Sequence, residues 1–562
     1  MNSEWQELDV QWQAFSPEDK LRIIEEGLKN AVKIPPPPKS EKRVVIVGAG
    51  MAGLVAAHVL KQTECFRVVV LEATQRVGGR IRTIREPYFT DNLYGEAGAM
   101  RIPKDHKLTL TYVDRAKLTL YEFKNEDDNA WCFVNSDKMR WRDYRERVGT
   151  KDCFNLKLKD NVRKTIGQRF KDDVIEPLRI DMQEIMERDK KNKDQALNDL
   201  MQQCPRDSTD SRRKYSTHRY LREVHGWSPE AINAFGLLEN QQARMNNGVV
   251  ALLREHLAGS FSPLEHPPEE VPDSQSEPDL YQIDGGMDLL PKSLYADLEK
   301  DIIFGARVDV LDKGYEEVAI HYSSIAGGDS ITGAYAIITL PLPMLRHIEL
   351  RATSGESWDS QKSSAIQELN YSESGKILFQ CKERFWESGD YPIEGGRSQT
   401  DLPIRTIYYP TKPDNPNLLE KRNRSTRAVL LASYTWGRDS QRLTYLKHQE
   451  RIQYAFAALS KIHDKELRDR PDMIEGAYSI MWQDEGYAGG AFALTDPYQE
   501  EYDTACRSAD GRFHFAGEHT SLNYHRWIEG AVESGLRAAW EIYTTASNLS
   551  RKIKRSKSKE KN

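Results

Sequence analysis

The chain has 562 residues, of which 39% are hydrophobic and 30% are charged. This is an ordinary globular composition, and the length is enough for about two to four domains. The 80 basic and 86 acidic residues give a net charge of -6, which argues against nucleic acid as the main partner.

The sequence lacks the marks of export and of a membrane anchor. No segment approaches the run of about 18 apolar residues that a membrane span needs. Residues 1–20 are acidic and polar, so no signal peptide is expected. The six cysteines form no CxxC pair and no disulfide spacing. We therefore expect a cytoplasmic protein with reduced thiols, no membrane span and no metal site.

Residues 1–33 are expected to be helical, because apolar side chains from Trp5 to Phe15 recur at helical spacing. The prolines within 34–40 end that segment as a stiff linker. A buried strand, a glycine turn, a helix and a second buried strand follow in RVVIVGAGMAGLVAAHVLKQTECFRVVVLE. Continuous valine and isoleucine runs are typical of a parallel sheet covered on both faces.

From residue 155 to about 270 the chain is rich in charged residues, with apolar residues at helical spacing, and is expected to be helical. A proline-rich acidic loop is expected at 262–281. Strand-like runs return between 301 and 437, and a final strand and helix are expected at 513–545. The basic segment 549–562 is most simply a solvated, frayed terminus. This order predicts an α/β protein with a mixed-sheet region and a helical insertion.

The turn between the first two strands carries a dinucleotide-binding pattern. Gly48, Gly50 and Gly53 form G-x-G-x-x-G. The first glycine permits a tight turn, the second lets backbone approach a pyrophosphate, and the third lets the helix pack on the strand. Amides at the helix N-terminus then face the diphosphate. Glu72 ends the second strand, where a carboxylate can bind an adenosine ribose.

Two further stretches extend this pattern toward a larger cofactor. RVGGRIRT places Gly79 and Arg80 just beyond Glu72, in a turn suited to a second phosphate contact. FHFAGEHTSLNYHRWIEGAVESG joins a short strand, ending near Glu518, to a helix rich in small residues such as Ala531. Small residues let that helix approach a ligand closely.

These residues together resemble the flavin amine oxidases, and among them the L-amino-acid oxidases. The resemblance covers about residues 41–545. Its motifs occur in the family's order: the glycine triplet, EATQRVGGR, GAMRIP, DGGMDLLP, SGKILFQ, FAGEHT and RWIEGAVESG. It implies noncovalently bound FAD and an α/β, Rossmann-like fold of the GR2 type.

The resemblance also implies a domain division. The FAD-binding domain would comprise 41–83, 283–368 and 507–548. A mixed-sheet, substrate-binding domain would comprise 84–150 and 369–506, and a helical domain with its loop would be 151–282. The N-terminal segment 1–40 and the basic tail 549–562 flank them.

By the same resemblance, a set of residues would hold the FAD. Glu72 would bind the adenosine ribose, Arg80 the diphosphate and Val308 the adenine edge. Glu518 would bind a ribityl hydroxyl, and residues 527–532 would lie against the flavin ring. The full expected set is Gly48, Gly50, Ala52, Gly53, Glu72, Ala73, Gly79, Arg80, Met100, Arg101, Val308, Glu518, Trp527, Ile528 and Ala531.

Arg101 is the main candidate for substrate binding. In the L-amino-acid oxidases the arginine of G-x-M-R pairs with the substrate's α-carboxylate, and Arg101 has that place in GAMR. A planar guanidinium can take a carboxylate through two parallel hydrogen bonds. The alternative is that Arg101 is buried against an acid of the chain itself, with Glu96 close in sequence.

The resemblance assigns three more residues to catalysis. Tyr434 would share the carboxylate, Lys376 would hold a water near the flavin N5, and Trp527 would lie beside the flavin and the substrate amine. Apart from the family, Tyr434 reads as a half-buried strand residue, Lys376 as a solvated lysine and Trp527 as core. Trp482 either lines the same cavity or packs in the core.

Two departures from the family affect the expectations. Secreted members have a disulfide from the strand that here carries Cys381, but MIEGAYSIMW offers no partner cysteine, which favours an intracellular protein. Ala491 stands where the family has a bulky aliphatic residue, so we expect room for large or varied substrate side chains.

The resemblance thus implies an FAD-dependent L-amino-acid oxidase, expected as a homodimer or larger homo-oligomer. It would pass hydride from Cα to flavin N5 and yield a 2-oxo acid, ammonia and, with dioxygen, hydrogen peroxide. Three alternatives stay open: a monoamine or polyamine oxidase, an amino-acid monooxygenase that yields an amide, and a non-catalytic scaffold. Arg101 argues against the first, because amines carry no carboxylate.

Overall fold

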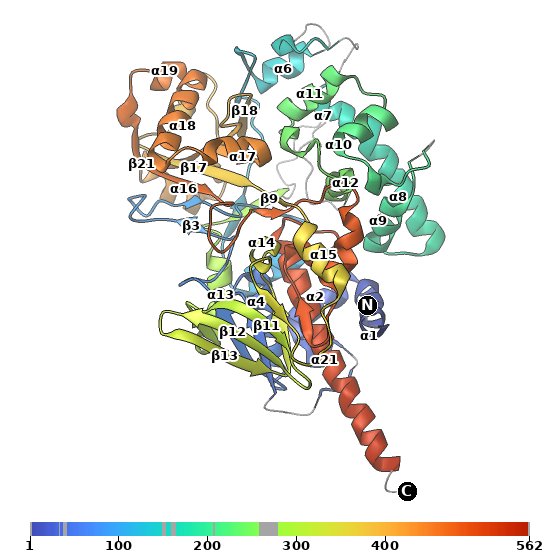
Figure 1. Cartoon of the computed structure of the whole chain (residues 1–562). Coiled ribbons are helices and arrows are strands. Elements are labelled where there is room, and N and C mark those ends of the chain that lie inside the picture. The colour runs from blue at the N-terminus through green and yellow to red at the C-terminus, as the bar shows by residue number, and fades with distance from the viewer. Residues whose placement is uncertain are drawn as a thin grey trace.

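The computed structural model describes residues 3–32, 34–37, 42–148, 153–158, 164–205, 208–257 and 279–559, without the side chains of 3, 194 and 551–559. A parallel sheet and its covering elements form the lower body in Figure 1. A mixed sheet with its helices lies above it on one side, and a group of helices lies above it on the other. The α/β fold class expected from the sequence is confirmed.

The N-terminal segment is helical, as predicted, but it forms separate helices: α1 (Ser3–Ala14), α2 (Pro17–Glu26) and α3 (Leu28–Ala31). Ser16 and Asp19 exchange side-chain to backbone hydrogen bonds of 3.1 Å in a capping box that starts α2. Gly27, with φ 77°, ends α2. Residues 38–40 of the predicted linker lie outside the described residues.

This segment is anchored on the last long helix, α21 (Ile528–Lys559). Trp5 Nε1 donates to Glu541 Oε1 over 3.2 Å, and Trp12 Nε1 donates to Glu533 Oε1 over 2.5 Å. Both tryptophans are buried, so apolar contact and hydrogen bonding act together here.

Five parallel strands form the sheet predicted from the valine-rich runs. Their order is β10 (Ile302–Phe304), β2 (Arg67–Glu72), β1 (Arg43–Val47), β14 (Tyr335–Ile338) and β23 (Phe513–Phe515). Along β1, Val44 and Ile46 pack against α4 (Met51–Gln62) and α21, whereas Val45 and Val47 pack on the opposite face. Because both faces are covered, β1 has no alternation of apolar and polar residues.

A second, twisted sheet covers that opposite face. It contains β13 (Gly327–Gly333), β12 (Val318–Ser324), β11 (Arg307–Lys313) and β15 (Glu349–Arg351). The first of the strand-like runs after residue 301 forms two strands, β10 and β11, because the chain turns at Gly305 with φ 68°. On the other face of the parallel sheet, helices α4 and α21 pack closely against each other. A Cβ on Gly535 of α21 would lie 2.5 Å from the Ala52 carbonyl oxygen of α4.

The mixed sheet joins distant parts of the chain. Its order is β21 (Ile474–Met481), β17 (Ser374–Cys381), β20 (Ala428–Trp436), β19 (Thr406–Tyr408), β18 (Arg397–Thr400), β7 (Trp131–Val134) and β8 (Asp137–Arg140). All neighbours are antiparallel except β18 and β7. The register sets Lys376 of β17 directly opposite Tyr434 of β20.

The helical insertion is present as predicted. Its longer helices are α8 (Glu176–Asp189), α9 (Lys193–Gln202), α11 (Pro229–Leu238) and α12 (Val249–Leu257). Most of the loop expected at 262–281 lies outside the described residues, which resume at 279.

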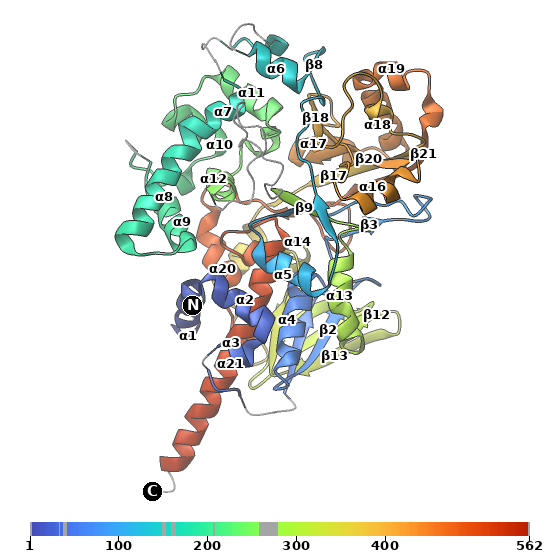
Figure 2. The same ribbon diagram turned by 180° about the vertical axis from the view of Figure 1, so that it is seen from behind.

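The C-terminal end of α21 extends away from the body (Figure 1, Figure 2). The sequence predicted a frayed tail from residue 549, but the backbone continues as a helix to Lys559. The high helix propensity of lysine and arginine allows this. Among the helices of the described ranges, none is long and apolar enough to span a membrane. Among the described residues, no disulfide joins any of the six cysteines.

Candidate active site

A cavity of about 840 Å³ lies at the carboxyl ends of the parallel strands. Its wall includes Val47 at the end of β1, Glu72 at the end of β2, Thr339 after β14 and Gly517 after β23. Open α/β sheets bind ligands at this edge. The volume falls in the range of about 300 to 1,000 Å³ that is usual for small-molecule sites.

The glycine turn forms part of this wall. Gly48 has φ 105°, and a Cβ on Gly53 would lie 2.0 Å from the Gly48 carbonyl oxygen. Apart from its chain neighbours, a Cβ on Gly50 would meet no atom of the described residues within 4 Å, so the backbone edge at the start of α4 faces the open cavity. Gly53 alone of the predicted cofactor residues is not on the wall, because it packs behind the turn.

The acid at the end of β2 is held in place. Glu72 Oε2 accepts from the Ala49 amide over 2.8 Å, and Oε1 accepts from the amide and the hydroxyl of Thr74 over 2.9 and 2.7 Å. Glu72, Ala73 and Val308 border the same part of the cavity. Each carboxylate oxygen has two lone pairs, so capacity remains for a ligand hydroxyl.

Arg80 and Glu518, predicted to bind different parts of the cofactor, contact each other. Arg80 Nη1 donates to Glu518 Oε1 over 2.7 Å and to the Ala491 carbonyl over 2.9 Å. Tyr371 also donates to Glu518 Oε1, over 3.0 Å. Burial opposes ionisation of Glu518, but the Arg80 charge outweighs it and lowers the Glu518 pKa to about 2. Both side chains line the cavity.

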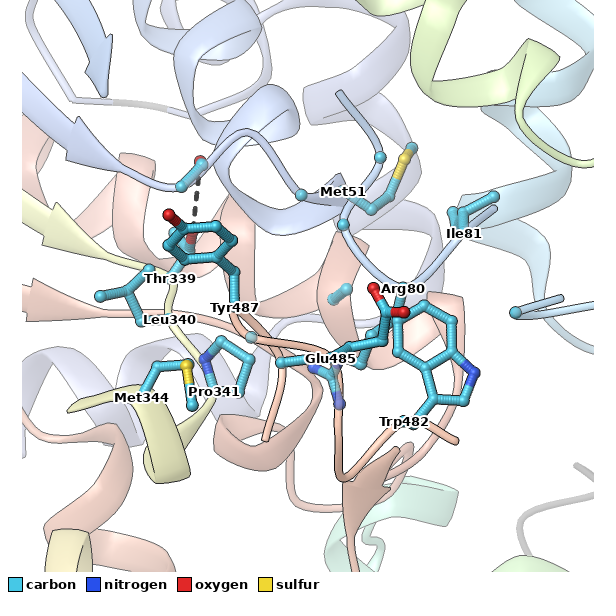
Figure 3. Close-up of a pocket in the computed structure, with 18 of the residues that line it drawn as sticks. Met51, Arg80, Ile81, Thr339, Leu340, Pro341, Met344, Trp482, Glu485 and Tyr487 are labelled. Atoms are coloured by element: carbon cyan, nitrogen blue, oxygen red, sulfur yellow. Dashed lines mark hydrogen bonds between the residues drawn. The ribbon is translucent and has the colours of Figure 1, made fainter. Parts of the chain in front are cut away.

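The segment after β21 closes one side of the cavity (Figure 3). Tyr487 lies beside Thr339, and Trp482 lies toward the other side, near Glu485. Trp482 Nε1 donates to the Ala97 carbonyl over 2.9 Å, so this residue both packs in the core and lines the cavity.

Arg101 precedes β5 (Ile102–Pro103) and lines the cavity with only 9% of its surface exposed. Its Nη1 donates to Asn125 Oδ1 over 2.7 Å and to Tyr408 Oη over 3.1 Å. Its guanidinium carbon lies 6.0 Å from the ring centroid of Trp527. Phe123 is a further ring neighbour, at 5.6 Å.

Glu96, the acid that the sequence suggested as an alternative partner for Arg101, is turned elsewhere. Its carboxylate accepts from the Thr83 hydroxyl over 3.0 Å and from the Met287 amide over 2.8 Å. Its backbone carbonyl accepts from Lys376 Nζ over 3.0 Å. Glu96 therefore supports Lys376 from behind the cavity wall.

Lys376 is buried rather than solvated. Its Nζ donates to the Gly98 carbonyl over 2.5 Å and lies 5.0 Å from the Tyr434 ring centroid. Burial lowers the pKa of Lys376, and Arg101 adds to this effect while Glu96 opposes it. Burial likewise raises the pKa of Glu96. A lysine amine with a lowered pKa therefore lies next to Tyr434, a candidate substrate-binding residue.

Trp527 lies directly before α21 and lines the cavity. Its ring centroid is 5.1 Å from that of His106, whose pKa burial lowers to about 3, so the imidazole is neutral. Trp527 Nε1 is buried, and within the described part of the chain it has no hydrogen-bond partner. Ile528, Ala531, Met100, Ala52 and Gly79 complete the predicted residues that the cavity wall contains.

The cavity also contains residues that the sequence did not predict. Arg526, Glu255, Trp436 and Phe492 line it, and Asn125 borders it through Arg101. The one sequence signal that could have pointed to Arg526 is its position directly before Trp527. Glu255 lies in the helical insertion, where nothing in its helical pattern marked it.

Comparison with known proteins agrees with this geometry. A sequence family described as flavin containing amine oxidoreductase matches residues 51–543. The chain belongs to this family. The family is flavin-containing, and the open backbone at Gly50, the acid at Glu72 and the indole N–H of Trp527, which has no partner among the described residues, fit FAD. The cofactor is FAD.

Relatives within the family span nearly the whole chain. The L-amino-acid oxidase of Echis ocellatus is 30% identical and covers 93% of this chain and 92% of its own. The L-amino-acid oxidase of Siganus canaliculatus is 30% identical and covers 93% of this chain and 88% of its own. A solved putrescine oxidase shares the fold, with TM-score 0.64, 17% identity and coverage of 90% of this chain and 99% of its own.

Proposed function

We propose that this chain is an FAD-dependent oxidase of L-amino acids. The reaction converts an L-amino acid, dioxygen and water into a 2-oxo acid, ammonia and hydrogen peroxide. The observation that carries this proposal is the buried Arg101 on the wall of the cavity, together with Lys376, Tyr434 and Trp527. The relatives named as L-amino-acid oxidases support it.

Arg101 binds the substrate's α-carboxylate, and the Tyr434 hydroxyl shares that charge. A guanidinium and a carboxylate form charge-assisted hydrogen bonds, which are stronger and better oriented in a water-poor cavity. Asn125 and Tyr408 hold the Nη1 edge of Arg101, so the group is oriented before the substrate arrives. Fixing the carboxylate fixes the direction of the substrate's Cα–H bond.

The cofactor is bound noncovalently by the residues assigned from the sequence. The amides at the start of α4 and Arg80 would hold the diphosphate, Glu72 the ribose of the adenosine, Val308 the adenine edge and Glu518 the ribityl chain. Bound FAD would supply the redox chemistry, as hydride acceptor from the substrate and electron donor to dioxygen.

The chain's own side chains position the substrate and wall its binding site. Lys376 Nζ, fixed by two backbone carbonyls, holds a water next to the substrate amine, and this water is available to hydrolyse the imino acid. Trp527 walls the amine side, and its ring is held by His106. No side chain has to remove the Cα proton, because it leaves as part of the hydride.

The deciding experiment follows the flavin absorbance without oxygen. L-amino acids should bleach the purified holoenzyme, whereas their D-enantiomers and the matching decarboxylated amines should not. Bleaching by amines alone would make the chain an amine oxidase and Arg101 structural. With oxygen, an amide product in place of the 2-oxo acid would make it a monooxygenase.

Three finer points belong to the same proposal. The protein acts in the cytoplasm, and it forms a homodimer or larger homo-oligomer, which light scattering can test. Its FAD-binding domain is 41–83, 283–368 and 507–548, and its substrate domain is 84–150 and 369–506. The parallel sheet falls in the first set and the mixed sheet in the second, which supports that division.

A further inference from the structure

Arg526 has a backbone conformation that long side chains rarely adopt. Its φ is 73°, in the left-handed region, and it directly precedes Trp527. Its amide donates to Glu518 Oε2 over 2.7 Å, so the backbone is fixed from the cofactor side. Strained residues of this kind persist where the surrounding structure holds them, and they cluster at functional sites.

The side chain of Arg526 is also fixed. It lines the cavity, and its Nη2 donates to Glu255 Oε2 over 2.5 Å. Its guanidinium carbon lies 5.9 Å from the Phe492 ring centroid. Only 7% of the side chain is exposed. A preorganised guanidinium of this kind loses little freedom when it binds a further anion.

The ionic group around Glu255 carries excess positive charge. Arg244 Nη1 lies 2.8 Å from Glu255 Oε2, the same oxygen that Arg526 contacts. Burial opposes ionisation of Glu255, but the two arginines outweigh it and lower its pKa to about 2. Burial lowers the Arg244 pKa only to about 10, and that of His256 to about 4. At neutral pH two cations therefore face one anion, since His256 is neutral.

The nearby acid Glu518 does not remove this excess, because it pairs with Arg80. Burial raises the pKa of the Tyr434 hydroxyl. The charges of Arg101 and Arg526 each lower it, so both arginines act on this hydroxyl. The two guanidinium groups thus lie within electrostatic reach of the same point in the cavity. A buried unbalanced cation is costly unless an anion meets it.

We propose that Arg526 forms a second carboxylate subsite, and that the substrates are L-amino acids with an acidic side chain, of the aspartate and glutamate class. This inference rests on the proposed function. The α-carboxylate binds Arg101, and the side-chain carboxylate binds Arg526. L-lysine and L-arginine are disfavoured, because their cationic ends would face this group.

The test uses the holoenzyme and the anaerobic flavin bleaching rate with L-glutamate, L-aspartate, L-glutamine, L-asparagine, L-phenylalanine and L-lysine. The acids should exceed their amides by about 10- to 100-fold in kcat/KM, as expected for charged hydrogen bonds. Arg526→Gly relieves the backbone strain and should remove that preference. Glu255→Gln should act in the opposite direction and tighten binding of the acids, because it removes the competing anion.

A binding measurement separates this subsite from turnover. Glutarate should perturb the flavin spectrum at lower concentration than butyrate does, and Arg526→Gly should abolish the difference. The inference is overturned, with the proposed function intact, if L-phenylalanine or other neutral amino acids exceed the acids. It is also overturned if Arg526→Gly changes acids and amides equally. Failure of every L-amino acid to bleach the flavin would remove both proposals.

Discussion

Asn125 Oδ1 accepts a hydrogen bond from Arg101 Nη1 over 2.7 Å. An amide at this point orients the guanidinium without neutralising it. Asn125→Asp would place a carboxylate there and compete with the substrate for Arg101. We expect the apparent Kd for L-amino acids to rise about 10- to 100-fold, equivalent to a charged hydrogen bond of about 1.5 to 3 kcal/mol.

Asn125→Ala is the matched control, since it removes the orienting bond and adds no charge. It should weaken binding less than Asn125→Asp, and anaerobic titration of the flavin measures both. Equal effects of the two variants would mean that Arg101 is held for packing and does not meet a substrate carboxylate.

The glycine turn allows folding and cofactor binding to be tested separately. A Cβ at Gly53 would lie 2.0 Å from a backbone oxygen, so Gly53→Ala should fail to fold. Gly50 has φ -71°, which alanine adopts freely, and its Cβ would enter the cavity. Gly50→Ala should therefore keep native circular dichroism and lose flavin. A normal flavin-to-protein ratio in Gly50→Ala would place the diphosphate elsewhere.

The coupling of Glu96 and Lys376 predicts a shifted pH profile. Burial lowers the pKa of Lys376, and the charge of Arg101 lowers it further. Ionised Glu96 acts in the opposite direction and raises it. Glu96→Gln removes this support, so the Lys376 pKa should fall and its limb in the pH dependence of flavin reduction should move to lower pH. Lys376→Met should abolish that limb. A limb that stays fixed in Glu96→Gln belongs to another group.

Glu541 should contribute to acid sensitivity. Burial opposes its ionisation, but Arg537 and His514 outweigh this and lower its pKa from 4.5 to about 2. A depressed folded-state pKa stabilises the protein above pH 4.5, and this contribution is lost as the pH falls toward 2. Glu541→Gln should flatten the fall in stability across that window and cost about 3 to 5 kcal/mol at neutral pH.

Chemical denaturation at several pH values checks this expectation. Glu26→Gln is the control, because Glu26 forms an exposed pair with Arg22 on α2 and its loss should leave the midpoint unchanged. An equal acid slope in wild type and Glu541→Gln would assign the effect to other carboxylates.

Local features of the cofactor site were predictable from the sequence. The glycine turn and Glu72 lie within one strand–helix–strand unit, where spacing determines geometry. Gly53 packs against the turn, as expected of the third glycine, because a Cβ there would meet the Gly48 carbonyl oxygen, and it lies off the cavity wall.

Contacts between distant segments were not predictable. Asn125 and Tyr408 are 283 residues apart and meet at Arg101 only because separate parts of the chain fold together. The pairing of Arg80 with Glu518, 438 positions away, has the same origin. Glu255 was missed because a single acid on an amphipathic helix normally faces water.

Helix α21 begins next to Trp527, and its first half carries Glu533 and Glu541, which accept hydrogen bonds from Trp12 and Trp5. The N-terminal helix α1 and the candidate active site therefore share one rigid element. Loss of α1 after cleavage would leave Glu533 and Glu541 without their tryptophan partners, whereas Glu541 would keep its pairs with Arg537 and His514. An affinity tag is therefore better placed on the projecting C-terminal end of α21 than on α1 (Figure 1, Figure 2).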